Sequence, residues 1–292
     1  TGLQKREVTA RFPRGAGAVG ADEFQIAIQG YELPRNAAGV VRETRAIWVS
    51  TSDIATAADI DELVDRCRSA GLNTIVPDIF VRNTVLATSK LMPTAESVSN
   101  DFDPLRYLIQ KARAARFEVH PWFCVTYRDR HFRRWFVDKF GASVDMLDKD
   151  GTVIDLGADV HRPEYRQFIA DLMVGVARDY PVDGIHLDYI RSMNRCFCGD
   201  CKKEFAQQYA KPLTEATEDD WIRWQRQAIG DIVERTAKGV RQVRPTAKMS
   251  AAVFANLSGG ASQGQDPAGW AQKGWMDLIL PMDYQMQTLL VR

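Results

Sequence analysis

One segment of the sequence places a histidine and a carboxylate where they could do chemistry. Residues 180–191 read Tyr-Pro-Val-Asp-Gly-Ile-His-Leu-Asp-Tyr-Ile-Arg. The Asp-Gly pair predicts a turn into a strand, and the two-residue alternation of a strand then puts His186 and Asp188 on one face. An ionised carboxylate there costs free energy unless it is solvated or partnered, so a functional role is favoured over a structural ion pair with Arg191.

Hydrolysis of a glycosidic bond is a reaction that needs two such carboxyl groups. One donates a proton to the leaving oxygen, and the other attacks carbon or activates water. With Asp188 as nucleophile or general base, Asp283 in Leu-Pro-Met-Asp-Tyr is the favoured acid, and Asp78 in Val-Pro-Asp-Ile is the reserve. For either partner the alternative is a loop carboxylate that caps a helix or pairs with an arginine.

Aromatic and polar residues near the same predicted strand ends could bind a sugar. Sugars present flat apolar faces, on which aromatic rings stack. Core packing is the alternative for the two tryptophans, and a satisfied core histidine is the alternative for His186. The candidate substrate-binding residues are Trp48, Trp122, Tyr127, Arg128, His186, Tyr189, Arg191 and Tyr284.

Three of the five cysteines, Cys196, Cys198 and Cys201, lie within six residues directly after the predicted strand that carries Asp188. A structural zinc ion needs four ligands, and Cys124 is the expected fourth. A disulfide and free thiols stay open as alternatives, and Cys67 is expected in the core. Bound zinc would brace the loop, so no cofactor is expected to be required for catalysis.

These residues need a scaffold of alternating strands and helices. Apolar, β-branched runs alternate with amphipathic stretches, which is typical of parallel strands joined by helices. No Gly-x-Gly-x-x-Gly motif follows the first strand, and polar residues recur at the strand ends, so a TIM-like (β/α)8 barrel is favoured over a dinucleotide-binding sheet. The predicted strands are 45–50, 74–79, 118–125, 184–190, 248–254 and 277–284, and the predicted helices are 60–70, 104–115, 163–179, 217–243 and 267–274.

Composition and organisation narrow the function further. Lys plus Arg and Asp plus Glu both total 38, so no basic excess exists to bind nucleic acid. No apolar run reaches the roughly 20 residues that span a bilayer, and nothing before Arg45 resembles a signal peptide. Residues 1–43 are rich in turn residues, with one possible strand at 24–28, and are expected to form an extension. Residues 44–292 are expected to form the barrel domain.

Several motifs occur together in one order along the chain. They are Ala-Ile-Trp-Val-Ser at 46–50, Ser-Lys-Leu at 89–91, Asp-Pro-Leu at 103–105, His-Pro-Trp-Phe at 120–123, His-Arg-Pro-Glu at 161–164 and the segment 182–191. Through them, residues 45–284 resemble the glycosyl hydrolase-like 10 family, TIM-barrel proteins related to bacterial cell-envelope glycosidases.

The resemblance implies hydrolysis of a bacterial or environmental polysaccharide, with peptidoglycan-type glycan strands as one possibility. It also implies that Asp188 stands where the family carries its signature aspartate, and it favours a secreted or cell-envelope location. His186 and Ile190 depart from the chitinase motif, so a chitinase mechanism is not expected. The alternatives are a non-catalytic carbohydrate-binding barrel and, less favoured, a zinc-dependent hydrolase that uses the cysteine loop.

Six predicted strands fall short of the eight in a complete barrel. The sequence therefore predicts a barrel whose last two strands are missing from this chain. An unusual closure by residues 1–43 and completion by another chain are the alternatives. Unpaired strand edges would be a liability for such a protein in isolation.

Overall fold

The computed structural model describes residues 4–13, 21–30, 43–81, 84–99 and 101–284, and the chain divides into two compact units, Thr1–Thr44 and Arg45–Arg292. The first unit contains a hairpin of two antiparallel strands, β1 (Gln4–Pro13) and β2 (Ala21–Gly30). The possible strand at 24–28 lies within β2. The sequence pattern does not predict β1, because charged residues interrupt its apolar alternation.

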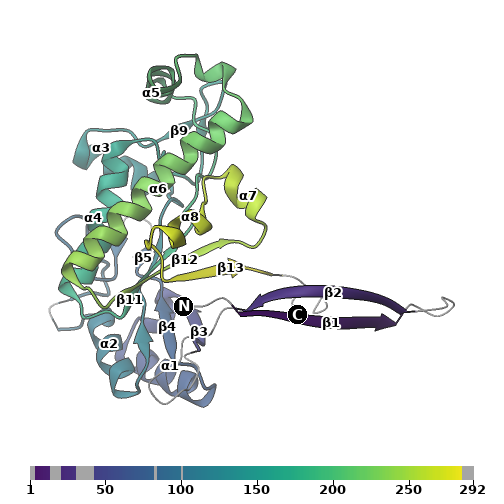
Figure 1. Cartoon of the computed structure of the whole chain (residues 1–292). Helices are drawn as coiled ribbons and strands as arrows, with labels where there is room; N and C mark the ends of the chain where they lie inside the picture. The colour runs from purple at the N-terminus through teal and green to yellow at the C-terminus, as the bar shows by residue number, and fades with distance from the viewer. Residues whose placement is uncertain (1–3, 14–20, 31–42, 82–83, 100, 285–292) are drawn as a thin grey trace. The chain divides into compact units, whose positions relative to one another are not determined.

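The second unit contains all six predicted strands, the third of them in two pieces (Figure 1). They are β3 (Ala46–Val49), β4 (Thr74–Pro77), β7 (Glu118–Val119) with β8 (Trp122–Cys124), β11 (Gly184–Asp188), β12 (Lys248–Phe254) and β13 (Leu278–Met282). The break between β7 and β8 falls at Pro121, whose nitrogen has no hydrogen to donate to the ladder. Two short antiparallel hairpins lie in loops: β5 (Phe80–Val81) with β6 (Thr84–Val85), and β9 (Met146–Leu147) with β10 (Val153–Ile154).

Eight α-helices are present in the part of the chain that the structure describes. They are α1 (Ala57–Ser69), α2 (Pro104–Ala114), α3 (Arg130–Phe140), α4 (Pro163–Asp179), α5 (Gly199–Tyr209), α6 (Glu218–Val243), α7 (Leu257–Ser262) and α8 (Pro267–Gln272), with short 3-10 turns at η1 (Thr51–Ile54) and η2 (Leu213–Glu215). The five predicted helices correspond to α1, α2, α4, α6 and α8. The sequence pattern does not predict the short α7 or the strongly charged α3 and α5.

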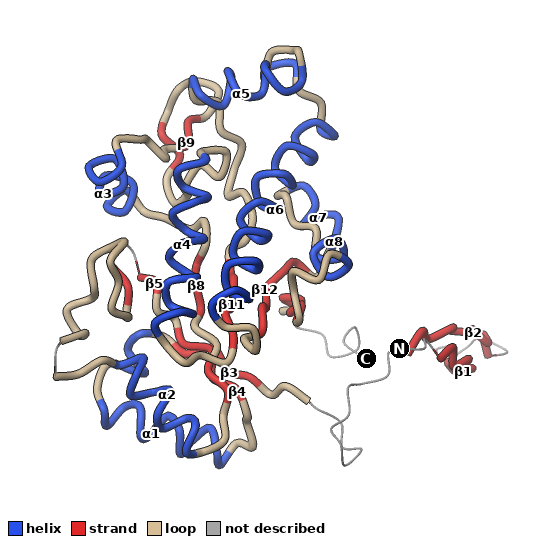
Figure 2. Tube along the Cα trace, turned by 60° about the vertical axis from the view of Figure 1, so that its left-hand side comes forward, coloured by secondary structure: helices blue, strands red, loops and turns tan. Residues whose placement is uncertain are grey.

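The strands form one curved parallel layer. β3 pairs with β4 and β4 with β7, while β8 pairs with β11, β11 with β12 and β12 with β13. A parallel bridge between Asp78 and Trp122 connects the two groups. Helices cover the outer side, with α4 and α6 packed side by side and α1 beside α2 (Figure 2). The core lies between this layer and the helices, where Ile75, Phe123 and Leu187 are fully buried.

One contact between side chains of distant strands shows that this layer is curved. Trp48 on β3 and His186 on β11 lie three strand positions apart, which in a flat sheet is about 14 Å. The Trp48 Nε1 and His186 Nε2 atoms nevertheless lie 3.0 Å apart. The sheet therefore curls so that these side chains meet on its inner face, as in part of a barrel.

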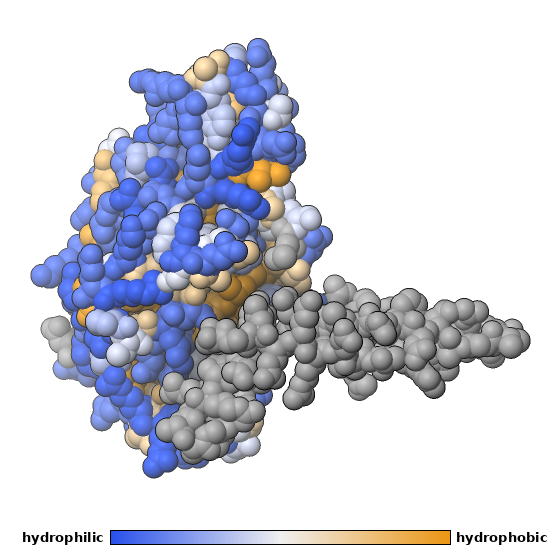
Figure 3. Space-filling view, in the orientation of Figure 1, coloured by the Kyte–Doolittle hydropathy of each residue, from blue (hydrophilic) through white to orange (hydrophobic). Residues whose placement is uncertain are grey.

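The two outer strands of the layer are incompletely covered. On β3, Ile47 is 37% exposed, and on β13 Leu278, Ile279 and Leu280 are half-buried. Figure 3 shows a mostly hydrophilic face on which apolar side chains gather around the middle, where β12 and β13 lie in the same view. Two further strands between β13 and β3 stay a prediction, since the described residues do not show closure.

Candidate active site

Asp188 ends β11 and is half-buried at the carboxyl end of the sheet. Its Oδ1 accepts a hydrogen bond of 2.6 Å from the backbone N–H of Tyr189. Tyr189 has a φ of 48°, in the left-handed region that non-glycine residues rarely adopt. Such a conformation costs of order 1–3 kcal/mol, and residues that adopt it cluster at functional sites. The turn thus fixes the carboxylate at the end of its strand.

Neighbouring side chains hold this turn from two sides. Thr126 Oγ1 lies 2.6 Å from the carbonyl oxygen of Tyr189 and 2.7 Å from that of Arg191. The guanidinium carbon of Arg191 lies 4.5 Å from the ring centre of Tyr189 and 4.7 Å from that of Phe254. These contacts restrain a positive charge close to Asp188.

Burial and these neighbours act on the Asp188 carboxyl in opposite directions. Burial raises the pKa of Asp188, whereas the Tyr189 N–H, the charge of Arg191 and the indole of Trp122 lower that pKa. Trp122 Nε1 is buried and makes no regular hydrogen bond to another described residue. The Trp122 indole N–H therefore lowers the pKa of Asp188 as a nearby donor, without a well-formed hydrogen bond.

Asp78 lies on the same inner face. It pairs with Trp122, which pairs in turn with His186, and the next inner residues, Cys124 and Asp188, also pair. Burial raises the pKa of Asp78 to about 6, with a further rise from the negative charge of Asp188, while the Phe80 N–H and Arg128 lower it. The two carboxyls are thus coupled electrostatically, as groups that share one site are.

Asp283 lies just beyond β13 and is exposed, and the adjacent Tyr284 is 84% exposed. Within residues 101–284, the Asp283 side chain makes no hydrogen bond or ion pair, and only its backbone N–H is bonded, to the carbonyl oxygen of Pro281. The structure therefore brings the reserve acid, Asp78, into electrostatic contact with Asp188 and leaves the favoured acid, Asp283, apart.

A hydrogen-bonded chain crosses the inner face beneath the carboxylates. The Trp48 indole donates to His186 Nε2, and His186 Nδ1 lies 3.0 Å from Ser250 Oγ, which is 3.5 Å from the carbonyl oxygen of Ile185. Because Nε2 accepts, the proton of the neutral imidazole resides on Nδ1 and is donated to Ser250. Burial and the nearby His120 lower the pKa of His186 to about 3, which keeps the ring neutral.

Partly exposed aromatic rings lie near the residues that surround Asp188. Tyr127 is 38% exposed, and its ring centre lies 5.0 Å from that of Tyr189. Trp48 is 41% exposed although its N–H is bonded to His186. These rings offer apolar faces of the kind on which sugars stack.

Arg128 does not reach this surface, contrary to the prediction that it binds substrate. The side chain is 1% exposed, and its guanidinium carbon lies 3.5 Å from the ring centre of Phe80. It also donates to the carbonyl oxygen of Cys124, and burial lowers its pKa. The residue is a buried cation beneath Asp78 and Cys124, where the aromatic ring and the carbonyl oxygen hold it.

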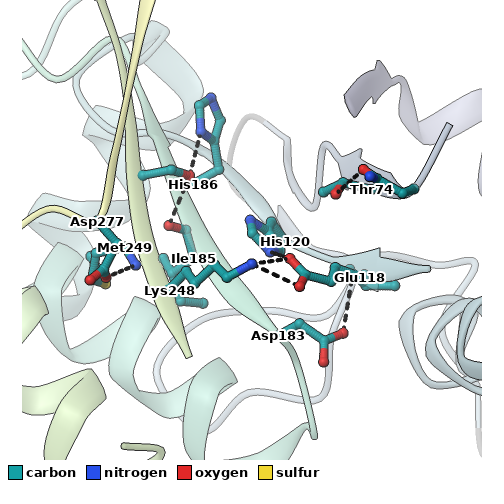
Figure 4. Close-up of polar contacts among 12 residues, drawn as sticks. Thr74, Glu118, His120, Asp183, Ile185, His186, Lys248, Met249 and Asp277 are labelled. Atoms are coloured by element: carbon teal, nitrogen blue, oxygen red, sulfur yellow. Dashed lines mark hydrogen bonds and ion pairs between the residues drawn. The ribbon is translucent and has the colours of Figure 1, made fainter. Parts of the chain in front are cut away.

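A second charged group occupies the opposite, amino-terminal end of the strands (Figure 4). Lys248 Nζ lies 2.7 Å from both carboxylate oxygens of Glu118, and His120 Nε2 lies 3.1 Å from one of them. Hydrogen bonds from His120 and Lys248 lower the pKa of Glu118 to about 2, against the effect of burial. Barrel enzymes place their chemistry at the carboxyl ends, so this group has a structural role.

The cysteine cluster has a different fourth member from the predicted one. Sulfur atoms of Cys196, Cys198 and Cys201 and a carboxylate oxygen of Asp159 all lie within 4.8 Å of one another. Cys124 is instead close to Asp78 and Asp188; burial raises the pKa of its thiol to about 12, and the charges of these two carboxyls add to that rise. The prediction of Cys124 as a ligand is wrong because β8 places that residue on the inner face. Nothing in the spacing of the sequence indicates Asp159.

Comparison with known proteins adds to this geometry. The sequence profile of the glycosyl hydrolase-like 10 family matches residues 43–289. The chain belongs to this family. Among its curated relatives are glycosyl hydrolase DigH of Escherichia coli (strain K12), 24% identical over 80% of this chain, and glycosyl hydrolase YngK of Bacillus subtilis (strain 168), 22% identical over 83%. The chain spans 59% of the first relative's length and 54% of the second's.

Solved structures support the same fold for this glycosyl hydrolase-like 10 chain. The PgaB (BpsB) glycoside hydrolase domain from Bordetella bronchiseptica has a TM-score of 0.63 at 12% identity, covering 82% of this chain and 74% of that one. A β-galactosidase from Bacillus circulans sp. alkalophilus has a TM-score of 0.57 at 14% identity, covering 82% and 40%. At these identities the likeness shows the fold alone. None of the helices that the structure describes has the length and apolar character to cross a bilayer.

Proposed function

We propose that the chain hydrolyses glycosidic bonds of a bacterial polysaccharide, with Asp188 and Asp78 as its two carboxyl groups. The observation that carries this proposal is the coupling of two partly buried carboxyls on the inner face, both with a raised pKa. Glycosidases use two carboxyl groups, and their environments keep one protonated as the acid and the other ionised as the nucleophile or base. Family membership supports the reaction class, and the relatives named glycosyl hydrolases support it further.

The surroundings support a different role for each carboxyl. Asp188 faces a backbone N–H and the Arg191 cation, which stabilise its ionised form and suit it to attack the anomeric carbon or to accept a proton from water. Asp78, with its pKa raised to about 6, keeps a proton into weakly acidic solution and donates it to the leaving oxygen. Trp48, Tyr127 and Tyr189 provide stacking faces for the sugar rings.

The substrate class is also part of the proposal. We infer a bacterial glycan, with peptidoglycan-type strands as the first candidate, because the relatives are bacterial glycosyl hydrolases.

The test uses the natural full-length protein and a panel of bacterial glycans, including peptidoglycan strands with and without stem peptides. We expect new reducing ends from the wild type and none from Asp188→Asn, with glycan binding and the melting temperature unchanged in the variant. Binding by both proteins with turnover by neither would contradict the proposal and favour a carbohydrate-binding barrel.

A further inference from the structure

The cysteine cluster brings together four metal-binding donors, three of them on buried residues and the fourth on the half-buried Cys198. Cys201 Sγ lies 3.0 Å and Cys198 Sγ 3.7 Å from the same Oδ2 of Asp159. Asp159 is fully buried, Cys196 and Cys201 are each 1% exposed, and all three cysteines are free thiols in the structure. We propose that Asp159, Cys196, Cys198 and Cys201 bind one structural zinc ion.

The spacing of the donors suits this ion. Zinc binds sulfur at about 2.3 Å and carboxylate oxygen at about 2.0–2.2 Å, which in a tetrahedron puts donors about 3.4–3.8 Å apart. The four donor atoms all lie within 4.8 Å of one another, so small side-chain movements bring them to that geometry. Three thiolates and one oxygen favour zinc over calcium or magnesium, which prefer oxygen alone.

The surroundings already orient the donors. Oδ1 of Asp159 accepts the backbone N–H of His161 at 3.0 Å, which turns Oδ2 toward the sulfurs. The backbone N–H groups of Leu147 and Cys201 approach the sulfurs of Cys196 and Cys198, both at 3.4 Å. Contacts of this kind hold metal ligands in place in the absence of the ion.

Nearby charges favour anionic donors. Cys198 caps the amino end of α5, where the helix dipole stabilises a thiolate. The Arg162 cation lies close enough to Asp159 and Cys198 to interact electrostatically with both. A zinc ion would supply the positive charge that lets these donors be ionised together in the interior.

The position of the cluster explains what the ion would do. Cys196 and Cys201 belong to a small apolar cluster, separate from the main core, that also contains Met146, Phe205, Trp221 and Trp224. This satellite cluster joins α5 to β9 and to the start of α6, and a metal ion commonly stabilises an apolar core of this size. Its members are buried, so the site is suited to hold structure and not to provide the open coordination position of a zinc hydrolase.

The first experiment measures the metal directly. The purified full-length protein, dialysed without chelator, should contain one zinc ion per chain when its metal content is measured by inductively coupled plasma mass spectrometry. After zinc is removed with a chelator in denaturant, all five cysteines should react with a thiol reagent. Absence of zinc from the protein, combined with failure to bind added Zn²⁺, would overturn the proposal, as would a disulfide within the cluster.

Matched variants identify the fourth ligand. Asp159→Asn should lower zinc affinity at least about tenfold, since even the loss of an outer-shell partner has an effect of this size. Cys124→Ser, which removes the fourth cysteine predicted from sequence, should keep one zinc per chain. The reverse result, zinc lost from Cys124→Ser and kept by Asp159→Asn, would contradict the assignment. Co²⁺ in place of zinc should give the thiolate charge-transfer absorption of a sulfur-rich tetrahedral site.

A structural readout follows from Trp221, Trp224 and the exposed Lys202 and Lys203 on α5. Chelation of the folded protein should shift tryptophan emission to longer wavelength and open α5 to trypsin at the two lysines, and added Zn²⁺ should reverse both changes. Unchanged emission and proteolysis after complete zinc loss would contradict a role in bracing this cluster. These readouts do not depend on glycan hydrolysis, so the two proposals can fail separately.

Discussion

The indole N–H of Trp48 is 3.0 Å from Nε2 of His186, and this contact joins the first strand of the layer to the strand that carries Asp188. It requires a neutral histidine whose proton is on Nδ1, directed at Ser250. The ring is fully buried, and its pKa is lowered to about 3. Protonation of Nε2 would remove the acceptor of this hydrogen bond.

Burial of the His186 ring makes the stability of the fold depend on pH. The pKa of His186 rises from about 3 in the folded state toward its usual value of about 6.5 on unfolding, so the unfolded chain binds more protons between these values. We expect the free energy of unfolding of the wild type, relative to His186→Gln, to fall as pH drops from about 6.5 and to be constant above it. Urea titrations at several pH values measure the difference, and a difference independent of pH would contradict the assignment.

A second prediction concerns the acid. If Asp78 donates the proton, kcat/KM should fall as pH rises above about 6, where the carboxyl ionises. Asp78→Asn should lower kcat/KM by about 10²–10⁴-fold and remove that limb of the pH profile. Asp283→Asn is the matched control, because it changes an exposed carboxyl just beyond the end of β13. A profile unchanged in Asp78→Asn but altered in Asp283→Asn would return the acid role to Asp283.

A third prediction tests the packing beneath the site. A Cβ at Gly184 would lie 2.7 Å from Nδ1 of the buried His120 ring, so Gly184→Ala should destabilise the fold by about 1–3 kcal/mol. A Cβ at Gly230 in α6 would meet no atom within 4 Å beyond the backbone of its own helix, so Gly230→Ala should stabilise by about 0.5–1 kcal/mol. Denaturant unfolding of both variants provides the comparison, and equal effects would contradict the close approach of His120.

The strand order and the position of Asp188 could be predicted from sequence, because apolar alternation and turn residues act locally. The electrostatic coupling of Asp78, and not Asp283, to Asp188 could not be predicted, because it depends on strand register and sheet curvature. The burial of Arg128 could not be predicted from sequence either. An arginine near a strand end is normally exposed, and only the tertiary position of Phe80 reveals why this one is buried.

The candidate zinc site was also only partly predictable from the sequence. Three cysteines within six residues are visible in the sequence, whereas Asp159 joins them only through the fold, from the loop that precedes α4. The sequence pattern does not predict strand β1 or helix α5, because charged residues interrupt the apolar spacing of both segments. Such elements are stabilised by contacts with distant segments of the chain, which the local sequence pattern does not predict.

The most direct test of the central claim is kcat/KM for one hydrolysed bacterial glycan, measured in parallel for the wild type, Asp188→Asn, Asp78→Asn and Asp283→Asn. We expect kcat/KM to fall at least about 10²-fold in the first two variants and to change little in the third. Full activity in Asp188→Asn, with the glycan still bound, would contradict a glycosidase centred on Asp188.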